Sequence, residues 1–218
     1  MTVACPVCRQ PEALYFMAVD GLEYWRCQQC EARFLDPRYL PDAATEHAHY
    51  LHHENDPGDL DYRRFLSRLS EPLLARLGAG PLSGLDYGCG PGPALAGMLG
   101  EAGHKMAVYD PFFAPDEGPL SETYDFITCT EAAEHFHTPA AEFDRFDAML
   151  CPGGWLGVMT CFQTDDDRFA RWHYRADPTH VVFYRAETFR FIASARGWAC
   201  EVPAKDIVLM RKPRRTPA

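Results

Sequence analysis

The sequence predicts an α/β fold in which helices flank a mostly parallel sheet, with a small hairpin in front. Two observations carry this prediction. A glycine-rich turn at 88–92 stands between an apolar, strand-like stretch and a helical one, the arrangement with which parallel sheets build ligand sites. Strand-like and helical stretches then alternate down to residue 211, and two Cys-x-x-Cys pairs precede them. Such alternation is typical of α/β proteins.

The length and composition of the chain fit a globular protein. Its 218 residues, 47% of them hydrophobic, suit one substantial domain with a small added module. The formal net charge of −10 speaks against an extended nucleic-acid-binding surface. No apolar run reaches the length of a membrane span, and Met1–Cys5 lacks the pattern of a signal peptide. We therefore expect a cytoplasmic protein without a membrane span.

Four of the nine cysteines form an array with the spacing C-x2-C-x18-C-x2-C, namely Cys5, Cys8, Cys27 and Cys30. Between the pairs, strand-like stretches at 13–19 and 22–27 are joined by Asp20-Gly21, a strong hairpin signal. Such a hairpin brings the pairs together, and four thiolates complete a tetrahedral zinc site. A redox role is the alternative, but redox pairs stand at strand–helix junctions. We expect a zinc-ribbon-like module at 1–36 with structural zinc.

The segment 37–80 connects this module to the glycine turn. It contains four histidines within seven residues at 47–53. Because no array of cysteines or carboxylates accompanies them, we interpret the run as a solvated or lid-like segment rather than a second metal site. Asp59 has the character of an N-cap for a helix that runs to about Leu77. The segment is thus predicted to be a helical linker and lid.

The glycine turn departs from the dinucleotide-binding fingerprint G-x-G-x-x-G. Its glycines are Gly88, Gly90 and Gly92, and Pro93 stands where the fingerprint needs its third glycine. Together with Asp86 the turn reads D-x-G-x-G-x-G, which resembles the first motif of class I S-adenosylmethionine-dependent methyltransferases. The resemblance implies a Rossmann-like methyltransferase sheet with an antiparallel last strand, and S-adenosylmethionine as cofactor.

Asp110 ends a strand-like stretch at 105–110 and lies 22 residues after the first glycine of the turn. At about this spacing a carboxylate reaches the ribose hydroxyls of a nucleotide cofactor. Pro111 and Phe112 follow and are suited to cover an adenine face. Only 13 residues separate Asp110 from Tyr124, too few for the usual helix and third strand. We therefore expect the third strand to be short or missing.

A second resemblance comes from the stretch YDFITCTEAAEHF at 124–136. It is similar to the fourth strand and following loop of small-molecule methyltransferases that act on quinols and sugars. With the other motifs, the likeness covers 83–162 in the right order and implies a methyltransferase domain at 81–218. The cofactor site implied by these motifs consists of Asp86, Gly88, Cys89, Gly90, Gly92, Asp110, Pro111, Phe112, Thr130 and Glu131.

Two further segments are expected to close over this site. The insertion at 163–180 is rich in aromatic residues and arginines, which suggests a substrate lid over the strand ends. In methyltransferases of this type, the helix that precedes the glycine motif covers the cofactor pocket. The resemblance therefore implies Tyr50 and Tyr62 as lid contacts.

Methyl transfer to a hydroxyl or a carbon acid needs a group that removes the acceptor's proton. His135 is the predicted general base, because the pKa of histidine lies near neutral pH. Glu134 or Glu131 would orient its imidazole or bind acceptor hydroxyls, and His180 is a further catalytic candidate. For each histidine, an ordinary hydrogen-bonding role is an equal alternative. A catalytic metal held by the two glutamates and His135 is conceivable but not required.

These inferences predict a methyltransferase that moves a methyl group from S-adenosylmethionine to an oxygen, carbon or nitrogen atom of a small molecule. Two alternatives stay open: a zinc-ribbon RNA methyltransferase, and a scaffold that binds the cofactor without catalysis. The net charge of −10 speaks against RNA, and the Glu134–His135 pair speaks against an inactive scaffold. The sequence names neither the acceptor nor the oligomeric state.

Overall fold

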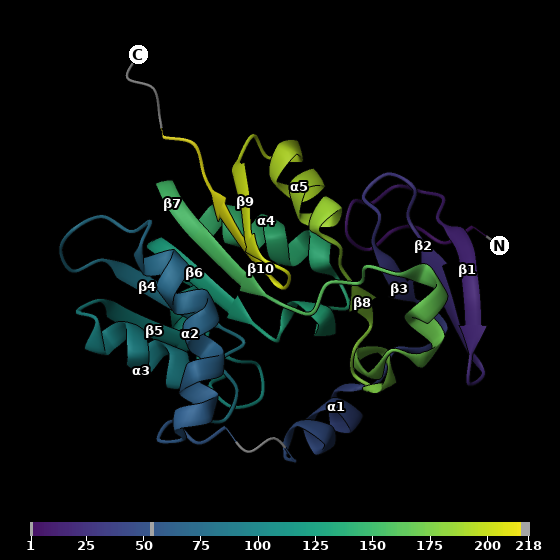
Figure 1. The fold of residues 1–218 in the computed structure, drawn as a ribbon, viewed down its shortest axis with the longest axis horizontal. Helices are drawn as coiled ribbons and strands as arrows, with labels where there is room; N and C mark the ends of the chain where they lie inside the picture. The colour runs from purple at the N-terminus through teal and green to yellow at the C-terminus, as the bar shows by residue number, and fades with distance from the viewer. Residues whose placement is uncertain (1, 53–54, 215–218) are drawn as a thin grey trace.

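The computed structural model describes residues 2–52 and 55–214. Within these ranges the strands form two sheets, a six-stranded sheet of order β5-β4-β6-β7-β10-β9 and a four-stranded sheet of order β1-β2-β3-β8. Figure 1 shows the six-stranded sheet flanked by helices, with the four-stranded sheet beside it on the right. The chain is thus an α/β protein with a small β module.

The six-stranded sheet is mostly parallel. Its strands are β4 Ser83–Tyr87, β5 Lys105–Tyr109, β6 Tyr124–Thr130, β7 Leu150–Met159, β9 Ala199–Ala204 and β10 Ile207–Arg211. The strands β5, β4, β6 and β7 run parallel, whereas β10 pairs antiparallel with both β7 and β9. This pattern confirms the predicted fold class, a Rossmann-like sheet whose last strand is antiparallel.

The predicted truncation of the sheet after β5 is also confirmed. The segment 111–123 contains a short 3-10 helix, Gly118–Ser121, and an isolated bridge joins Asp110 to Ala114, but the described residues between β5 and β6 form no further strand. Prolines at 111, 115 and 119 lack the N–H group that a strand ladder needs. As a result β5 forms one edge of the sheet.

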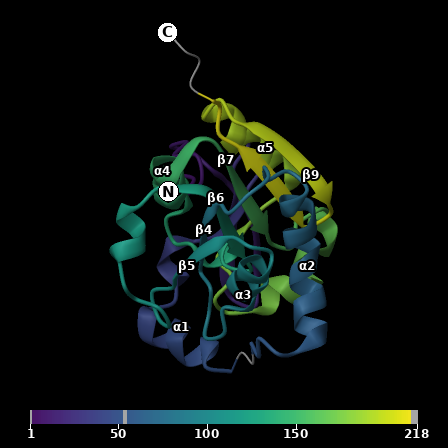
Figure 2. The ribbon, with the colours of Figure 1, turned by 90° about the vertical axis from the view of Figure 1, so that its left-hand side faces the viewer.

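Helices cover both faces of the six-stranded sheet. They are α2 Leu60–Leu74, α3 Ala94–Glu101, α4 Pro139–Met149 and α5 Ala186–Ala195, whereas α1 Ala43–Tyr50 lies away from these faces, below the strands in Figure 1. Leu69 of α2 and Leu95 of α3 pack in one core with Phe126, whereas Phe143 of α4 and Ile192 of α5 belong to a second core. Figure 2 shows α2 and α4 on opposite sides of the strands. The strands contribute side chains to both cores because successive side chains of a strand point to opposite faces of the sheet.

The start of α2 agrees with the prediction. The carboxylate of Asp59 accepts a hydrogen bond from the N–H of Asp61 at 2.8 Å, which makes Asp59 the N-cap. The helix ends at Leu74 rather than near Leu77.

None of the helices in the described ranges combines the length and the apolar character that crossing a lipid bilayer requires.

The four-stranded sheet combines the N-terminal segment with a strand from far along the chain. Its strands are β1 Leu14–Val19, β2 Leu22–Arg26, β3 Arg33–Leu35 and β8 Val182–Phe183. Asp20 and Gly21 have φ values of 53° and 83°, as a tight turn between paired strands requires. The antiparallel pairing of β8 with β3 was not predicted from the sequence. The division into 1–36, 37–80 and 81–218 stays a prediction.

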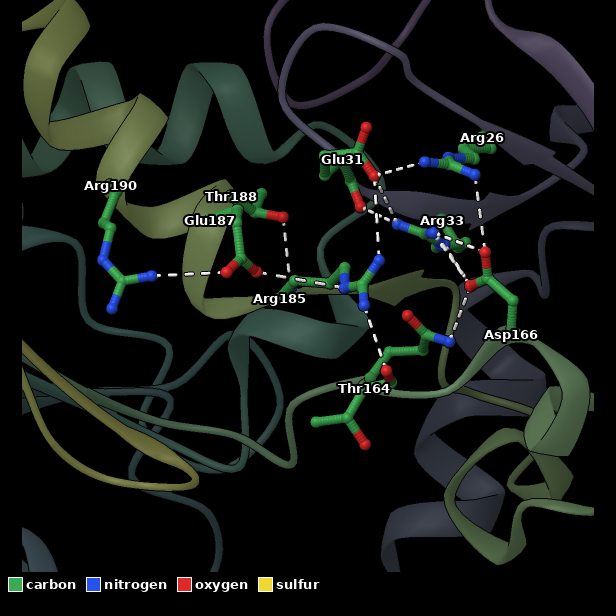
Figure 3. A network of polar contacts seen from close by, with 10 residues as sticks. Arg26, Glu31, Arg33, Thr164, Asp166, Arg185, Glu187, Thr188 and Arg190 are labelled. Atoms are coloured by element: carbon green, nitrogen blue, oxygen red, sulfur yellow. Dashed lines mark hydrogen bonds and ion pairs between the residues drawn. The ribbon is translucent and has the colours of Figure 1, made fainter.

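The insertion that precedes β8 lies against this small sheet. Its Phe169 packs edge-on against aromatic rings of β1, β2 and β8. Figure 3 shows the accompanying polar network, in which Arg33 of β3 contacts Asp166 and Glu31. Arg33 is fully buried and donates three hydrogen bonds to the Asp166 carboxylate, at 2.8, 2.9 and 3.1 Å. The insertion is therefore attached to the N-terminal module.

Candidate active site

A cavity of about 610 Å³ opens at the carboxyl ends of β4, β5 and β6. All four predicted catalytic residues line it, namely His135, Glu134, Glu131 and His180. The predicted cofactor residues line it as well, apart from Gly92. This edge of an open α/β sheet is the usual place for a ligand. The structure therefore brings the predicted cofactor and acceptor halves of the site to a common space.

The turn after β4 requires glycine at two positions. Gly88 and Gly90 have φ values of 75° and 64°, a region that favours glycine. The N–H groups of Gly88 and Cys89 donate to the carbonyl of Tyr109 at 2.8 and 3.3 Å. A Cβ on Gly88 would lie 2.5 Å from the Cβ of Ala132. The turn is thus fixed to the end of β5 and packed against the loop after β6.

Gly92 has a different role from the other two glycines. It does not line the cavity, and a Cβ at this position would lie 1.8 Å from the carbonyl oxygen of Asn55. Asn55 follows α1 and does line the cavity. Gly92 therefore allows the segment between α1 and α2 to approach the turn closely.

The carboxylate of Asp110 organises the end of β5. One oxygen, Oδ2, accepts from the N–H of Gly90 at 3.0 Å, while Oδ1 accepts from the N–H groups of Phe112 and Phe113 at 2.9 and 3.0 Å. A carboxylate has about four lone-pair sites, so these bonds leave one for a ligand. Asp110 can accept a hydrogen bond from a ribose hydroxyl while it holds the glycine turn.

Asp86 of β4 is a second buried carboxylate that lines the cavity. Thr128 donates a hydrogen bond to its Oδ1 at 2.8 Å. Burial raises the pKa of Asp86 to about 6, although the bond from Thr128 acts in the opposite direction. Near neutral pH this side chain is close enough to its pKa for a cationic ligand group to favour its charged form.

Aromatic residues from the predicted linker face the cavity. The ring of Tyr50 at the end of α1 packs edge-on against Phe112 and His135, with centroid distances of 5.4 and 5.2 Å. Tyr62 of α2 also lines the cavity. Both tyrosines therefore line the same cavity as the residues expected to hold the cofactor, and their role as lid contacts stays a prediction.

The histidine run at 47–53 contacts this region through individual side chains. His47 stacks on Phe112 with nearly parallel rings, 6° apart, at a centroid distance of 5.4 Å. The Nε2 atom of His49 lies 3.0 Å from Oδ2 of Asp177 in the insertion. His53 lies outside the described residues. The described part of the run thus forms contacts with the loop after β5 and with the insertion.

The end of the cavity that holds the predicted catalytic residues is built around a buried carboxylate. Glu134 is fully buried, and its Oε1 accepts a hydrogen bond from the hydroxyl of Tyr174 at 2.5 Å. Its Oε2 has no hydrogen-bond partner among the described residues. The Tyr174 hydroxyl also lies 3.0 Å from Thr160 Oγ1 and 3.3 Å from Glu131 Oε2. Sequence reasoning did not single out Tyr174, because only the folded insertion brings it to Glu134.

Two histidines lie beside Glu134 with matching orientations. Nδ1 of His135 lies 3.0 Å from the carbonyl oxygen of Thr179, and Nδ1 of His180 lies 2.7 Å from that of Tyr174. A carbonyl oxygen only accepts, so each Nδ1 carries the proton and each neutral ring has its lone pair on Nε2. Burial lowers the pKa of His135, which favours this neutral form.

Glu131 starts the loop after β6 in an unusual backbone conformation. Its φ is 47°, which is uncommon for a residue other than glycine and is often found at functional sites. Its N–H donates to the carbonyl of Met159 at 2.8 Å, which holds the loop to β7. Burial and the neighbouring charge of Glu134 raise the pKa of Glu131 to about 9. The raised pKa favours the protonated form of Glu131.

A further polar group in the cavity was not predicted from the sequence. Tyr87 of β4 donates to Oε2 of Glu142 at 2.5 Å, and Arg145 donates to the Tyr87 hydroxyl at 2.6 Å and to Glu142 at 2.8 Å. All three residues line the cavity. The i, i+3 spacing of Glu142 and Arg145 indicates a surface ion pair on a helix. Only the packing of α4 against β4 turns this pair inward.

The four patterned cysteines meet at the end of the hairpin. The Sγ atoms of Cys5 and Cys30 are 3.6 Å apart, those of Cys8 and Cys27 are 3.5 Å apart, and all four lie within 4.8 Å of one another. A disulfide would need about 2.05 Å, whereas Zn–S bonds of about 2.3 Å place tetrahedral thiolates roughly 3.8 Å apart. The cluster fits a structural metal ion such as zinc, as the sequence predicts.

The two cysteine pairs have the same local geometry. The residues that follow them, Arg9 and Glu31, have φ values of 60° and 62°. Each donates its N–H to the carbonyl of the first cysteine of its pair, at 2.9 Å for Arg9 and 3.0 Å for Glu31. Matching turns of this kind present both thiols of a pair to one point. All four positions are protein ligands, so the site leaves no open position for catalysis.

The fold is shared with solved methyltransferases. The magnesium protoporphyrin IX methyltransferase of Synechocystis PCC 6803 with bound SAH has a TM-score of 0.52 at 12% identity, over 80% of this chain and 97% of that one. The 1,6-didemethyltoxoflavin-N1-methyltransferase of Burkholderia thailandensis gives 0.51 at 18% identity, over 92% and 100% of the two chains. The protein therefore has the Rossmann-like fold of S-adenosylmethionine-dependent methyltransferases.

The family follows from the sequence match. A family model described as a methyltransferase domain matches residues 49–201, and the chain belongs to this family. The predicted enzyme class, an S-adenosylmethionine-dependent methyltransferase, is thus confirmed. No protein with a curated description matches the chain significantly.

Proposed function

We propose that the protein transfers the methyl group of S-adenosylmethionine to a small-molecule acceptor. The observation that best supports this proposal is that predicted cofactor residues and predicted catalytic residues line one cavity. Its lining includes the glycine turn and Asp110 together with Glu134, His135 and His180. Its volume of about 610 Å³ is in the range of small-molecule sites. The Burkholderia thailandensis structure, which contains 1,6-didemethyltoxoflavin and S-adenosylhomocysteine, supports an acceptor of this class.

The cofactor half fits S-adenosylmethionine by the chemistry of its residues. When bound, this cofactor supplies an electrophilic methyl group on a sulfonium. The free lone pair of Asp110 binds a ribose hydroxyl, and Phe112 offers a ring face to adenine on the side away from His47. The proposed cofactor contacts are Asp86, Gly88, Cys89, Gly90, Asp110, Pro111, Phe112, Thr130 and Glu131. Gly92 supports this site through its packing on Asn55.

The acceptor half provides a base and a group that stabilises its charged form. The Nε2 lone pair of His135 accepts the acceptor's proton, while the Nδ1–H bond to Thr179 at 3.0 Å keeps the ring oriented. The resulting imidazolium lies beside Glu134, whose Oε1 is 4.0 Å from Nε2. Nearby negative charge in a buried site favours protonation of the histidine at that moment.

A turnover screen tests the proposal. The wild-type protein is incubated with methyl-labelled S-adenosylmethionine and with hydroxylated aromatics, nucleotide sugars or tRNA. We expect label on a small molecule, and label on tRNA alone would contradict the proposal. With the acceptor found, His135→Ala should keep the cofactor affinity and lower kcat about 100-fold or more. The matched control is His173→Ala, since His173 is exposed; undiminished turnover of His135→Ala would remove His135 from the mechanism.

A further inference from the structure

Three side chains at the acceptor end present one potential metal ligand each. Nε2 of His135 and Nε2 of His180 are both 4.0 Å from Oε1 of Glu134, and one ligand atom from each residue lies within 4.8 Å of the others. A distance of 4.0 Å is too long for a hydrogen bond. Direct hydrogen bonds among the three residues therefore do not explain why they converge.

Both histidines have the orientation of metal ligands. In protein metal sites, a ligating imidazole usually donates its other N–H to a backbone carbonyl or a carboxylate, which fixes the tautomer and aims the free nitrogen at the ion. His135 donates Nδ1–H to Thr179 and His180 donates Nδ1–H to Tyr174, at 3.0 and 2.7 Å. The two bonds leave both Nε2 lone pairs free, and both Nε2 atoms lie 4.0 Å from Oε1 of Glu134.

An oxygen atom of Glu134 that lacks a hydrogen-bond partner within the described part of the chain independently indicates that a ligand binds here. Its side chain is fully buried, yet Oε2 has no hydrogen-bond partner among the described residues. A buried charged carboxylate is costly unless it is paired, hydrogen-bonded or bound to a metal ion. Of the two oxygens of Glu134, only Oε1 accepts a hydrogen bond from the hydroxyl of Tyr174. A cation between Glu134 and the two imidazoles would compensate the charge of this carboxylate.

We infer that Glu134, His135 and His180 form a site for a divalent transition-metal ion such as zinc or cobalt. Two imidazole nitrogens and one carboxylate oxygen are ligands that these metals accept, whereas magnesium and calcium prefer oxygen alone. Bonds of about 2.1 Å place tetrahedral ligands roughly 3.4 Å apart, so small side-chain movements would close the site. Since all three residues line the cavity, an open coordination position on the ion would be reachable from the cavity.

A metal ion bound at this site would activate an acceptor hydroxyl for methyl transfer. This role rests on the proposed function. A hydroxyl oxygen bound to the ion loses its proton more readily, and the proton passes to solvent. The oxygen then bonds to the methyl carbon while the carbon–sulfur bond breaks and sulfur keeps the electron pair. In the metal-loaded protein Nε2 of His135 is a ligand, so the base role assigned to it belongs to the metal-free form.

Titration with Co²⁺ tests the inference on the full chain with zinc already in the cysteine cluster. We expect one Co²⁺ to bind with visible absorption but without thiolate charge-transfer bands, while one zinc per chain is retained. Glu134→Gln and His180→Gln should weaken this binding by at least about 100-fold, beyond the loss typical of second-shell changes. The exposed His173→Gln should bind Co²⁺ as the wild type does. The histidine run at 47–53 is intact in every variant.

The outcomes separate this inference from the proposed function. Retained zinc in each variant shows that the cysteine cluster is intact. If the wild type binds no further Co²⁺, or if both variants bind it as tightly as the wild type, the metal site is refuted. Methyl transfer by metal-free protein would then still support the proposed function with His135 as the base. Specific Co²⁺ binding without methylation of any acceptor would instead support the metal site and count against the proposed function.

Discussion

The buried guanidinium of Arg33 and the carboxylate of Asp166 join the cysteine-bearing module to the insertion after β7 (Figure 3). Beyond Asp166 the insertion continues through Tyr174 and His180 directly into β8, which pairs with β3. The module that carries the cysteine cluster is therefore attached to the segment that contributes Tyr174 and His180 to the proposed acceptor site. Stability of the module and geometry of the acceptor site should change together.

Replacement of Arg33 by methionine tests this connection. The change leaves Asp166 without its main partner, and breaking a buried ion pair costs about 3–5 kcal/mol. Because the Asp166 side chain is 33% exposed, we expect a smaller loss of about 2 kcal/mol in urea unfolding. The KM for the acceptor should rise while the Kd of S-adenosylmethionine stays the same.

The control for this prediction is Arg64→Met. Arg64 pairs with Asp61 on the surface of α2, where the side chains are 79% and 85% exposed. Such pairs contribute under about 0.5 kcal/mol, so the control should unfold like the wild type. Equal stability of Arg33→Met and Arg64→Met would refute the coupling.

Loss of one cysteine ligand should affect more than the module. In Cys27→Ser the cluster has three thiolates, and a hairpin of this size has too small a core to stay folded without a metal. We expect zinc to be lost, as measured by elemental analysis, and the Tm and the acceptor affinity to fall. Cys200→Ser, at a half-buried cysteine of β9, is the control and should keep its zinc. Full zinc occupancy in Cys27→Ser would contradict the assignment.

Gly92 offers a test of the close approach between the glycine turn and the linker. In Gly92→Ala the new Cβ would lie 1.8 Å from the Asn55 carbonyl, so the linker must move away and the cavity must open. We expect lower stability and weaker binding of S-adenosylmethionine. In Gly97→Ala the new Cβ meets nothing within 4 Å, and this helical site should gain up to about 1 kcal/mol. Equal cofactor affinity in both variants would refute the packing role.

Asp86 predicts a pH dependence with a definite sign. Its pKa is raised from 3.8 to about 6 in the folded protein, so the folded state binds more protons than the unfolded state in this window. The contribution of Asp86 to stability therefore falls as the pH rises from 3.8 to 6. Relative to the wild type, Asp86→Asn should become progressively more stable over this range in unfolding experiments without ligand.

The exposed Asp61→Asn is the control for the pH experiment. Its stability difference from the wild type is measured at the same pH values, so that the change at buried Asp86 is compared with the removal of a carboxylate that is 85% exposed. Comparison of variant with wild type at each pH cancels the effects of other titrating groups, including the cysteine ligands. A constant difference for Asp86→Asn would show that its pKa is not raised.

Local signals explain how much of the fold was predictable. The Asp20-Gly21 turn, the Asp59 cap and the glycine turn at 88–92 depend on neighbours in sequence, and the structure contains all three. The missing third strand was also predictable, because 13 residues between Asp110 and Tyr124 leave too little chain. These features follow from backbone conformation and length alone.

Contacts between distant segments were not predictable in the same way. The two-residue strand β8 is too short to carry a periodic pattern, and it forms because β3 presents an unpaired edge. Tyr174 reaches Glu134 only when the insertion packs on the small sheet. The ring of His47 on Phe112 likewise depends on how α1 closes over the loop after β5. Each requires tertiary structure that a local sequence pattern does not contain.

Calorimetric titration of the protein with S-adenosylmethionine tests the central claim most directly. The wild type should bind one cofactor per chain, and Asp110→Ala should bind it about 10- to 100-fold more weakly, as expected for lost hydrogen bonds to a charged group. Asp116→Ala, at an exposed aspartate of the following loop, should bind like the wild type. No binding to the wild type, or equal Kd values for Asp110→Ala and the wild type, would contradict the account.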